Sequence, residues 1–111
     1  MFKRKKISKI KECIFVEKIT LNEKGIIYIK PQNYSFAMIY RSAMGVHWDA
    51  EKQCLYHNPT KIWGILEWYT QILAAVKDEY GMMLIVQSNT IYENIDNETI
   101  LKIKELSELI I

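Results

Sequence analysis

The sequence has too few cysteines and too short apolar runs for several large classes of protein. Its two cysteines, Cys13 and Cys54, cannot form the disulfide framework of a small secreted domain, so we expect free thiols in a reducing compartment. No stretch approaches the ~18 apolar residues of a transmembrane helix, and no apolar run follows the basic N-terminus as in a signal peptide. These absences predict a cytoplasmic protein with no membrane partner.

Motifs that mark common catalytic and cofactor sites are also missing. The chain has no Walker loop, no Gly-x-Gly-x-x-Gly, no Cys-x-x-Cys and no carboxylate pair at a recognisable catalytic spacing. We therefore assign no catalytic residue, no metal site and no cofactor, and we leave open whether the protein is an enzyme.

Positive charge is concentrated at the N-terminus. Residues 1–11 hold six basic residues and no acidic one, whereas the rest of the chain holds nine basic and thirteen acidic residues. A nucleic-acid-binding domain instead spreads basic residues over a folded face. We predict a basic arm over residues 1–11 and a single domain over residues 12–111. A less favoured interpretation is that this arm contacts nucleic acid through Lys3, Arg4, Lys5 and Lys6.

The clearest helical pattern lies between Asn58 and Gly81. Asn58 suits an N-cap, Pro59 suits the first helical position, and Gly81 suits the left-handed residue that ends a helix. One stripe of the helix is apolar and consists of Ile62, Leu66, Tyr69, Leu73, Val76 and Tyr80, widened by Ile65 and Ile72. We predict a long helix that buries this stripe against a sheet.

The remaining elements are strands and shorter helices. Residues 13–21 and 26–30 form an antiparallel hairpin, in which Gly25 supplies the positive φ of the turn. The other predicted elements are a helix over residues 33–44, a hairpin of residues 46–48 and 53–56, a central strand over 82–86, an edge strand over 91–95 and a helix from Asp96 or Asn97 to about Leu109. The predicted fold class is α+β: a small, mostly antiparallel sheet packed by one long central helix plus shorter helices.

The predicted second hairpin carries the residues that most resemble a site, namely His47, Trp48, Asp49, Cys54 and His57. Such a cluster is typical of metal sites and of nucleophile–base pairs. With a four-residue loop at residues 49–52, His47 faces Cys54 and Trp48 faces Gln53. His47, Asp49 and Cys54 then share one face of the hairpin, and His57 lies on the other face.

This register favours a structural interpretation of the hairpin. A metal site that uses both His47 and His57 would need the register to slip by one residue. Cys54 lacks the helix N-terminus that commonly lowers the pKa of a reactive thiol. We interpret Cys54 as a core residue and His47 as a half-exposed cross-strand neighbour, with a Cys54–His47 pair as the alternative.

Trp63 and Trp68 flank opposite edges of the apolar helix stripe, so both cannot be centred in one core. At least one of them covers the rim of the sheet or lines a groove. The candidate ligand-binding residues are therefore His47, Trp48, Asp49, Trp63 and Trp68.

The middle of the chain resembles small bacterial proteins that include integron gene-cassette proteins. The resemblance rests on residues 39–43, 45–49 and 55–56 and on Trp63, Trp68, Tyr69, Glu79, Tyr80, Gly81 and Leu84. It covers roughly residues 36–95 and contains no catalytic motif. It implies a compact α+β domain, a link to mobile DNA and no site residues.

We predict a non-enzymatic binding or interaction module that self-associates as a homodimer. The chain has three Trp, seven Tyr and an apolar end at residues 109–111, which is much apolar surface for one small core. One alternative is a small-ligand-binding protein or enzyme with a pocket near the 46–57 hairpin. Another is nucleic-acid binding through the basic arm.

Overall fold

The computed structural model describes residues 12–59 and 62–110 of the chain, without the side chains of residue 12 and residues 107–110. The predicted basic arm at residues 1–11 lies outside the described residues. Its predicted contact with nucleic acid, through Lys3, Arg4, Lys5 and Lys6, therefore stays a prediction.

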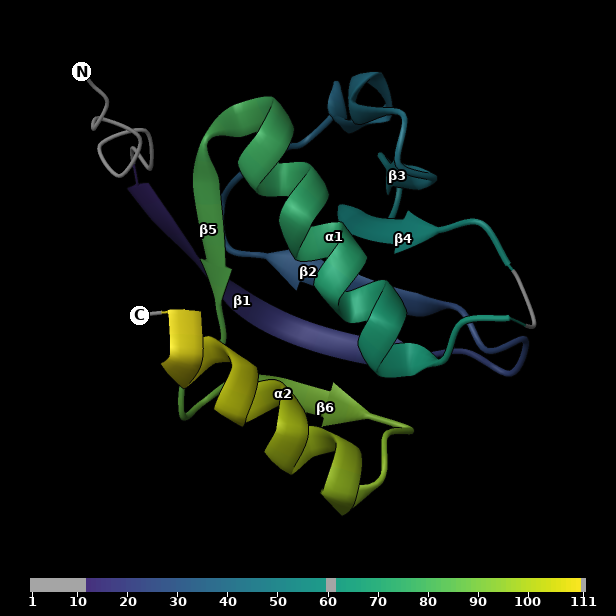
Figure 1. Ribbon diagram of the computed structural model, residues 1–111, viewed down its shortest axis with the longest axis vertical. Helices are drawn as coiled ribbons and strands as arrows, with labels where there is room; N and C mark the ends of the chain where they lie inside the picture. The colour runs from purple at the N-terminus through teal and green to yellow at the C-terminus, as the bar shows by residue number, and fades with distance from the viewer. Residues whose placement is uncertain (1–11, 60–61, 111) are drawn as a thin grey trace.

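Strand β1 (Glu12–Leu21) organises the sheet, because three other strands pair with it in the described part of the chain (Figure 1). Strand β2 (Ile27–Pro31) pairs with β1 in the antiparallel direction, as predicted. Strands β5 (Met82–Ile85) and β6 (Ile91–Glu93) pair with β1 in the parallel direction. The turn between β1 and β2 contains Gly25 with φ +82°, as predicted from its glycine.

Two further strands complete the sheet, β3 (Val46–Asp49) and β4 (Cys54–His57), in the order β3-β4-β2-β1-β5 with β6 also on β1. The α+β class is confirmed, but the sheet is mixed rather than mostly antiparallel. The reason is that the chain reaches β5 through a helical crossover, which returns it parallel to β1. The strand predicted as central over residues 82–86 is β5, which instead ends the strand order beside β1.

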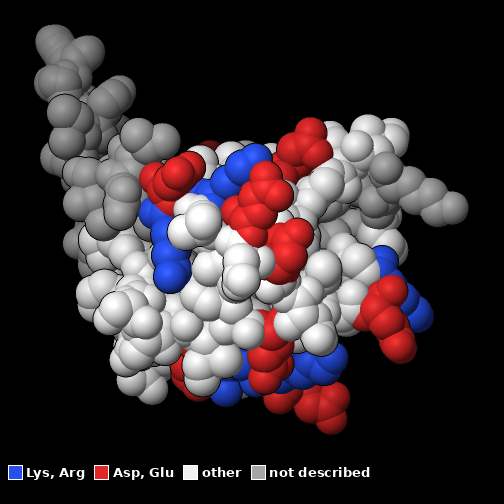
Figure 2. Space-filling view, turned by 90° about the horizontal axis from the view of Figure 1, so that it is seen from below, with Lys and Arg blue, Asp and Glu red and all other residues white. Residues whose placement is uncertain are grey.

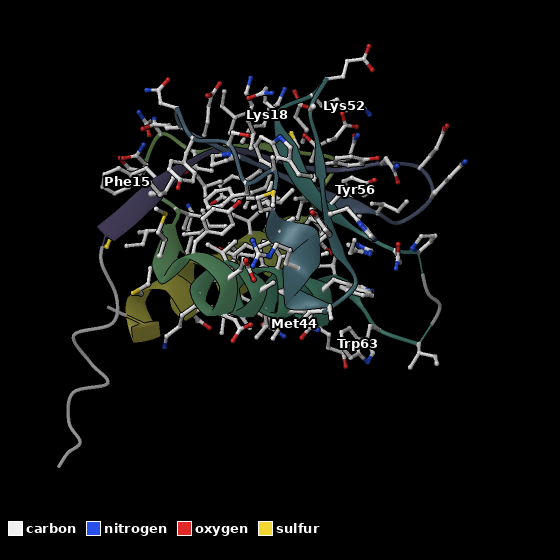
Figure 3. All side chains as sticks on the ribbon, turned by 90° about the horizontal axis from the view of Figure 1, so that it is seen from above. Phe15, Lys18, Met44, Lys52, Tyr56 and Trp63 are labelled. Atoms are coloured by element: carbon white, nitrogen blue, oxygen red, sulfur yellow. The ribbon has the colours of Figure 1, made fainter. Side chains whose placement is uncertain are left out.

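Both α-helices lie on one side of the sheet (Figures 1 and 3). Helix α1 (Ile65–Tyr80) has 16 residues and α2 (Asn97–Ile110) has 14, so the prediction of one long helix with shorter ones is corrected to two helices of similar length. The side chains that α1 buries are Trp68, Tyr69, Ile72, Ala75 and Val76. Ile103 of α2 is fully buried in the same core.

The start of α1 was predicted wrongly. Asn58 forms hydrogen bonds at the end of β4 and does not cap a helix. Its N–H donates to the Gly45 carbonyl at 3.1 Å, and its Oδ1 lies 2.8 Å from His47 Nε2. The N-cap is Gly64, whose N–H donates to the Glu67 carboxylate. Ile62, predicted on the buried stripe, therefore precedes the helix and is 85% exposed.

The helix predicted over residues 33–44 is replaced by one short 3₁₀ helix, η2 (Ile39–Ser42). Asn33 and Ala43 have φ of 49° and 58°, and an α-helix cannot continue through left-handed residues. Phe36 and Ile39 are nevertheless fully buried. The two side chains lie three residues apart because each packs into the core from an irregular segment, and not because they share one face of a helix.

Charged side chains do not gather by sign on the face of the molecule shown in Figure 2, where basic and acidic groups are interspersed. This distribution is unlike the single-sign basic face of a typical nucleic-acid-binding domain. No helix among the described residues is long and apolar enough to cross a membrane.

Candidate functional site

The β3–β4 hairpin places the predicted residues on the predicted faces, but its register differs by two residues. Asp49 pairs with Cys54, and His47 pairs with Tyr56 rather than with Cys54. A shift of two residues keeps each side chain on its own face. His47, Asp49 and Cys54 therefore share the face that points away from α1, and His57 lies on the buried face.

His57 is a structural residue rather than a ligand of a metal. The Ile27 N–H donates to His57 Nε2 at 3.1 Å, and His57 Nδ1 lies 2.7 Å from the Asn58 carbonyl oxygen. Since Nε2 accepts a hydrogen bond, the ring is neutral and its proton is on Nδ1, where it is donated to Asn58. Burial lowers the pKa of His57, with the Asn58 carbonyl acting in the opposite direction.

The other predicted hairpin residues also have structural contacts. The Asp49 carboxylate accepts the N–H groups of Glu51 and Lys52, both at 3.0 Å, and so closes the turn. Trp48 is half-buried and packs edge-on against Phe36, with ring centroids 6.0 Å apart. The structure brings His47 and Asp49 to one face but does not join them with Trp48 in a pocket.

Cys54 is buried, as expected, but it lies on the outer face of the sheet and outside the main core cluster. Its Sγ lies 3.3 Å from the Lys52 carbonyl oxygen. Burial raises the pKa of the Cys54 thiol, so the nucleophilic thiolate is disfavoured. No group of three potential metal ligands occurs among the residues that the structure describes.

The two tryptophans of the predicted site differ in exposure. Trp68 is only 7% exposed and stacks on His57 with centroids 4.2 Å apart and an interplanar angle of 7°. Trp63 packs against Trp68 at 4.7 Å but is 40% exposed on the helix side of the sheet (Figure 3). Trp68 therefore belongs to the core, and Trp63 is available at the surface.

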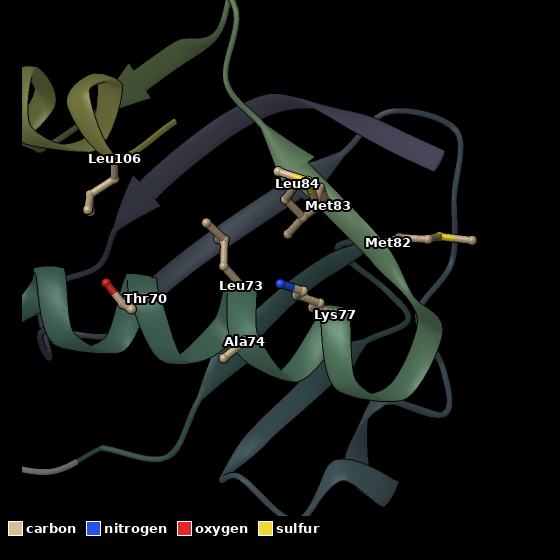
Figure 4. Close-up of a pocket in the computed structure, with 8 residues that line it drawn as sticks. All are labelled: Thr70, Leu73, Ala74, Lys77, Met82, Met83, Leu84 and Leu106. Atoms are coloured by element: carbon tan, nitrogen blue, oxygen red, sulfur yellow. The ribbon is translucent and has the colours of Figure 1, made fainter. Parts of the chain in front are cut away.

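A cavity of about 200 Å³ lies between α1, β5 and α2. Its walls are mainly apolar and include Leu73, Met83, Leu84 and Leu106. In Figure 4, Leu73 and Lys77 extend from α1 toward β5, and Leu106 comes from α2. Lys77 supplies the ionisable group among the described lining residues. Such a hollow has the apolar walls and sparse polar groups of a binding site.

A second, more open hollow of about 590 Å³ adjoins the first, because Thr70 and Leu106 line both. We call the two together the α1–α2 groove. Its described lining residues are Trp63, Leu66, Glu67, Thr70, Leu73, Ala74, Lys77, Met82, Met83, Leu84, Lys102, Glu105 and Leu106. Of the predicted site residues, Trp63 is the one that contributes to this groove.

Sequence reasoning missed the α1–α2 groove because it depends on the placement of α2. One local signal was available. Thr70, Ala74 and Lys77 recur at helical spacing beside the apolar stripe, and two of them are small. A face of small residues leaves room beside a helix, and that face lines the groove.

Comparison with known proteins identifies the family. The family model described as Integron Cassette Protein Hfx_Cass5 matches residues 15–90, which is more than half of the chain. The chain belongs to this family. The predicted resemblance to integron cassette proteins is thus confirmed, and the family description carries no activity.

A solved structure described as Integron Cassette Protein Hfx_Cass5, from the mobile metagenome of North West Arm Sewage Outfall, is 29% identical to the chain. The match covers 86% of this chain and 95% of that one, with a TM-score of 0.42. No curated protein matches the chain.

Proposed function

We propose that this integron cassette protein is a cytoplasmic, non-enzymatic binding module from bacteria that forms a homodimer through the α1–α2 groove. The observation that carries the proposal is the apolar groove next to two exposed apolar side chains. Ile62 and Trp63 are 85% and 40% exposed, and Trp63 also lines the groove. Apolar surface of this kind commonly marks a contact site.

A second copy of the chain is the partner that best fits this surface, because the chain offers both an apolar projection and an apolar hollow. A two-fold axis would place Ile62 and Trp63 of each copy on the groove of the other. Glu67, Lys77, Lys102 and Glu105 line the groove with two charges of each sign. Opposite charges of two copies can therefore face each other.

A non-enzymatic role is supported by the contacts of the hairpin residues whose side chains could act as a nucleophile, an acid or a base. Cys54 is buried with a raised thiol pKa, and His57 uses both ring nitrogens in hydrogen bonds to the backbone. Asp49 closes a turn. These groups have structural tasks, and none of them faces the α1–α2 groove.

Light scattering tests the dimer. We expect the wild-type chain to show a mass of twice 13.2 kDa at micromolar concentration. Ile62→Ser with Trp63→Ser should shift it toward the monomer. Tyr40→Ser is the matched control, because Tyr40 is 58% exposed on η2, which does not line the groove. A wild-type mass of 13.2 kDa that does not change on tenfold concentration would rule out the dimer.

Nucleic acid, bound through the N-terminal arm, is the other class of partner to be tested. It would appear as a salt-dependent mobility shift with DNA or RNA that disappears when residues 1–11 are deleted. No shift at low salt excludes it.

A further inference from the structure

The outer face of the sheet, which points away from α1, carries a cluster of lysines that the proposed dimer does not use. Lys18 of β1, Lys30 of β2 and Lys52 of the β3–β4 turn border a shallow pocket of about 350 Å³. Figure 3 shows Lys18 and Lys52 on the side of the sheet opposite to α1. Cys54 lines the same pocket, and all three ammonium groups lower the pKa of its thiol, against the larger raising effect of burial.

A β-bulge places Lys18 in this cluster. The pairing of β1 with β2 shifts register between Val16 and Lys18. Under strict alternation Lys18 would share the inward face of Val16, but the bulge turns Lys18 outward and leaves Ile19 fully buried. Bulges re-aim side chains in this way near functional sites.

The fold itself gains little from this arrangement. Lys18 and Lys30 are direct partners across the antiparallel pair, where two like charges repel. Lys18 has Glu93 at 3.7 Å and Lys30 has Glu17 at 3.7 Å, but ion pairs that are this exposed contribute little. A like-charged cross-strand pair that adds no stability to the fold is common at functional sites.

Aromatic rings continue from the lysine cluster toward β3. Tyr28 and Tyr56 stack with centroids 5.5 Å apart and an interplanar angle of 22°. His47 lies 5.5 Å from Tyr56, and the Lys52 ammonium lies 4.5 Å from the Tyr28 ring centroid. The outer face therefore combines a cationic pocket with rings on which a planar group can stack.

We propose that this face binds a small aromatic phosphate monoester of the size of a mononucleotide. The phosphate lies among Lys18, Lys30 and Lys52, whose ammonium groups donate charge-assisted hydrogen bonds to its oxygens. The aromatic part stacks on Tyr28, at the place that the Lys52 ammonium holds in the free protein. The pocket volume of about 350 Å³ is in the range of small-ligand sites.

The acidic residues around the cluster favour a small ligand over a nucleic-acid strand. Glu93 lines the pocket itself beside Lys18, Glu17 lies beside Lys30, and Asp49 is close enough to raise the pKa of Cys54. A single phosphate can sit among three lysines, whereas a chain of phosphates would have to pass these carboxylates.

Calorimetric titration of the full chain with AMP, adenosine and inorganic phosphate tests the site. We expect saturable binding of AMP at millimolar concentration or below, and at least tenfold weaker binding of adenosine and of phosphate. Lys18→Gln and Lys30→Gln should each weaken AMP binding severalfold. Tyr28→Leu should weaken AMP binding but leave phosphate binding unchanged. Thermal melting verifies that each variant folds.

Lys104→Gln is the matched control, because Lys104 also lies over a ring, 5.8 Å from Tyr92, but does not line the pocket. It should leave AMP binding unchanged, as should Ile62→Ser in the α1–α2 groove. No saturable heat with millimolar AMP overturns the proposal, and so does equal weakening by Lys18→Gln and Lys104→Gln. Binding of oligothymidylate that strengthens with its length would replace it with a nucleic-acid surface.

Discussion

His57 makes the stability of the fold depend on pH. Its neutral ring accepts the Ile27 N–H, stacks on Trp68 and has a lowered pKa because it is buried. As pH falls below about 6.5, the ordinary pKa of histidine, the unfolded chain binds a proton before the folded chain does. The free energy of unfolding that His57 contributes is therefore complete above this pH and is lost as pH falls toward the folded pKa.

We expect urea titrations to give a lower free energy of unfolding at pH 5 than at pH 7. His57→Gln should be less stable at pH 7 and should show a smaller difference between the two pH values. His47→Gln is the control, because His47 contacts the side chain of Asn58 and not the carbonyl oxygen that His57 uses. An equal pH dependence in wild type and His57→Gln would contradict this account.

Cys54 and Cys13 give a matched pair of thiols. Cys54 is 8% exposed with a raised pKa, whereas Cys13 is exposed. A thiol reagent should therefore label Cys13 first and Cys54 slowly, as measured by mass spectrometry of the peptides. Labelling of Cys54 faster than Cys13 would restore the nucleophile interpretation.

Replacing the Cys54 thiol by a hydroxyl should have a modest effect. The Lys52 carbonyl oxygen lies 3.3 Å from Sγ and can accept a hydrogen bond from the serine. We expect Cys54→Ser to lower the free energy of unfolding by about 1 kcal/mol, at the low end of the cost of a buried hydroxyl. A loss of 3 kcal/mol or more in urea titration would mean that the hydroxyl finds no partner.

Gly81 ends α1 in the way that its position after the helical pattern predicted. Its φ of 69° and ψ of 27° are left-handed, and its N–H donates to the Lys77 carbonyl at 2.9 Å. We expect Gly81→Val to cost about 1 kcal/mol or more, because a β-branched residue fits poorly at positive φ. Asn tolerates this conformation, so Gly81→Asn should cost less. Equal melting temperatures for the wild type and the Val variant would contradict the strain.

The sequence predicted elements well where local chemistry decides them. Gly25 and Gly81 marked a turn and a helix end, and the alternation in the 46–57 hairpin separated His47 from His57. The prediction from sequence was wrong at Asn58, whose hydrogen bonds join it to Gly45 and β3 and not to a helix. Contacts between distant segments leave no local pattern, and the α1–α2 groove was missed for the same reason.

The whole molecule has a groove on the helix side and a lysine cluster on the outer face of the sheet. Because α1 and the sheet separate these two surfaces, a partner on one side leaves the other accessible (Figure 3). A homodimer through the α1–α2 groove therefore allows two ligand pockets per dimer. The sequence predicted a groove or rim position for Trp63 or Trp68 and, as an alternative, a pocket near the 46–57 hairpin. It did not predict which other elements complete either surface, since each combines residues from several separate elements.

Dimerisation should make the stability of the protein depend on its concentration, because the second copy binds the folded chain and not the unfolded chain. We expect the melting temperature of the wild type to rise as protein concentration rises. Tyr40→Ser should behave in the same way, whereas Ile62→Ser with Trp63→Ser should melt at one temperature throughout. Ile62 is 85% exposed, whereas Trp63 is 40% exposed and packs on Trp68, so the double variant also weakens the fold. The dependence of the melting temperature on concentration, and not its absolute value, therefore reports the contact with the partner. A wild-type melting temperature that is constant over a hundredfold range of concentration would show that the groove does not hold a second copy.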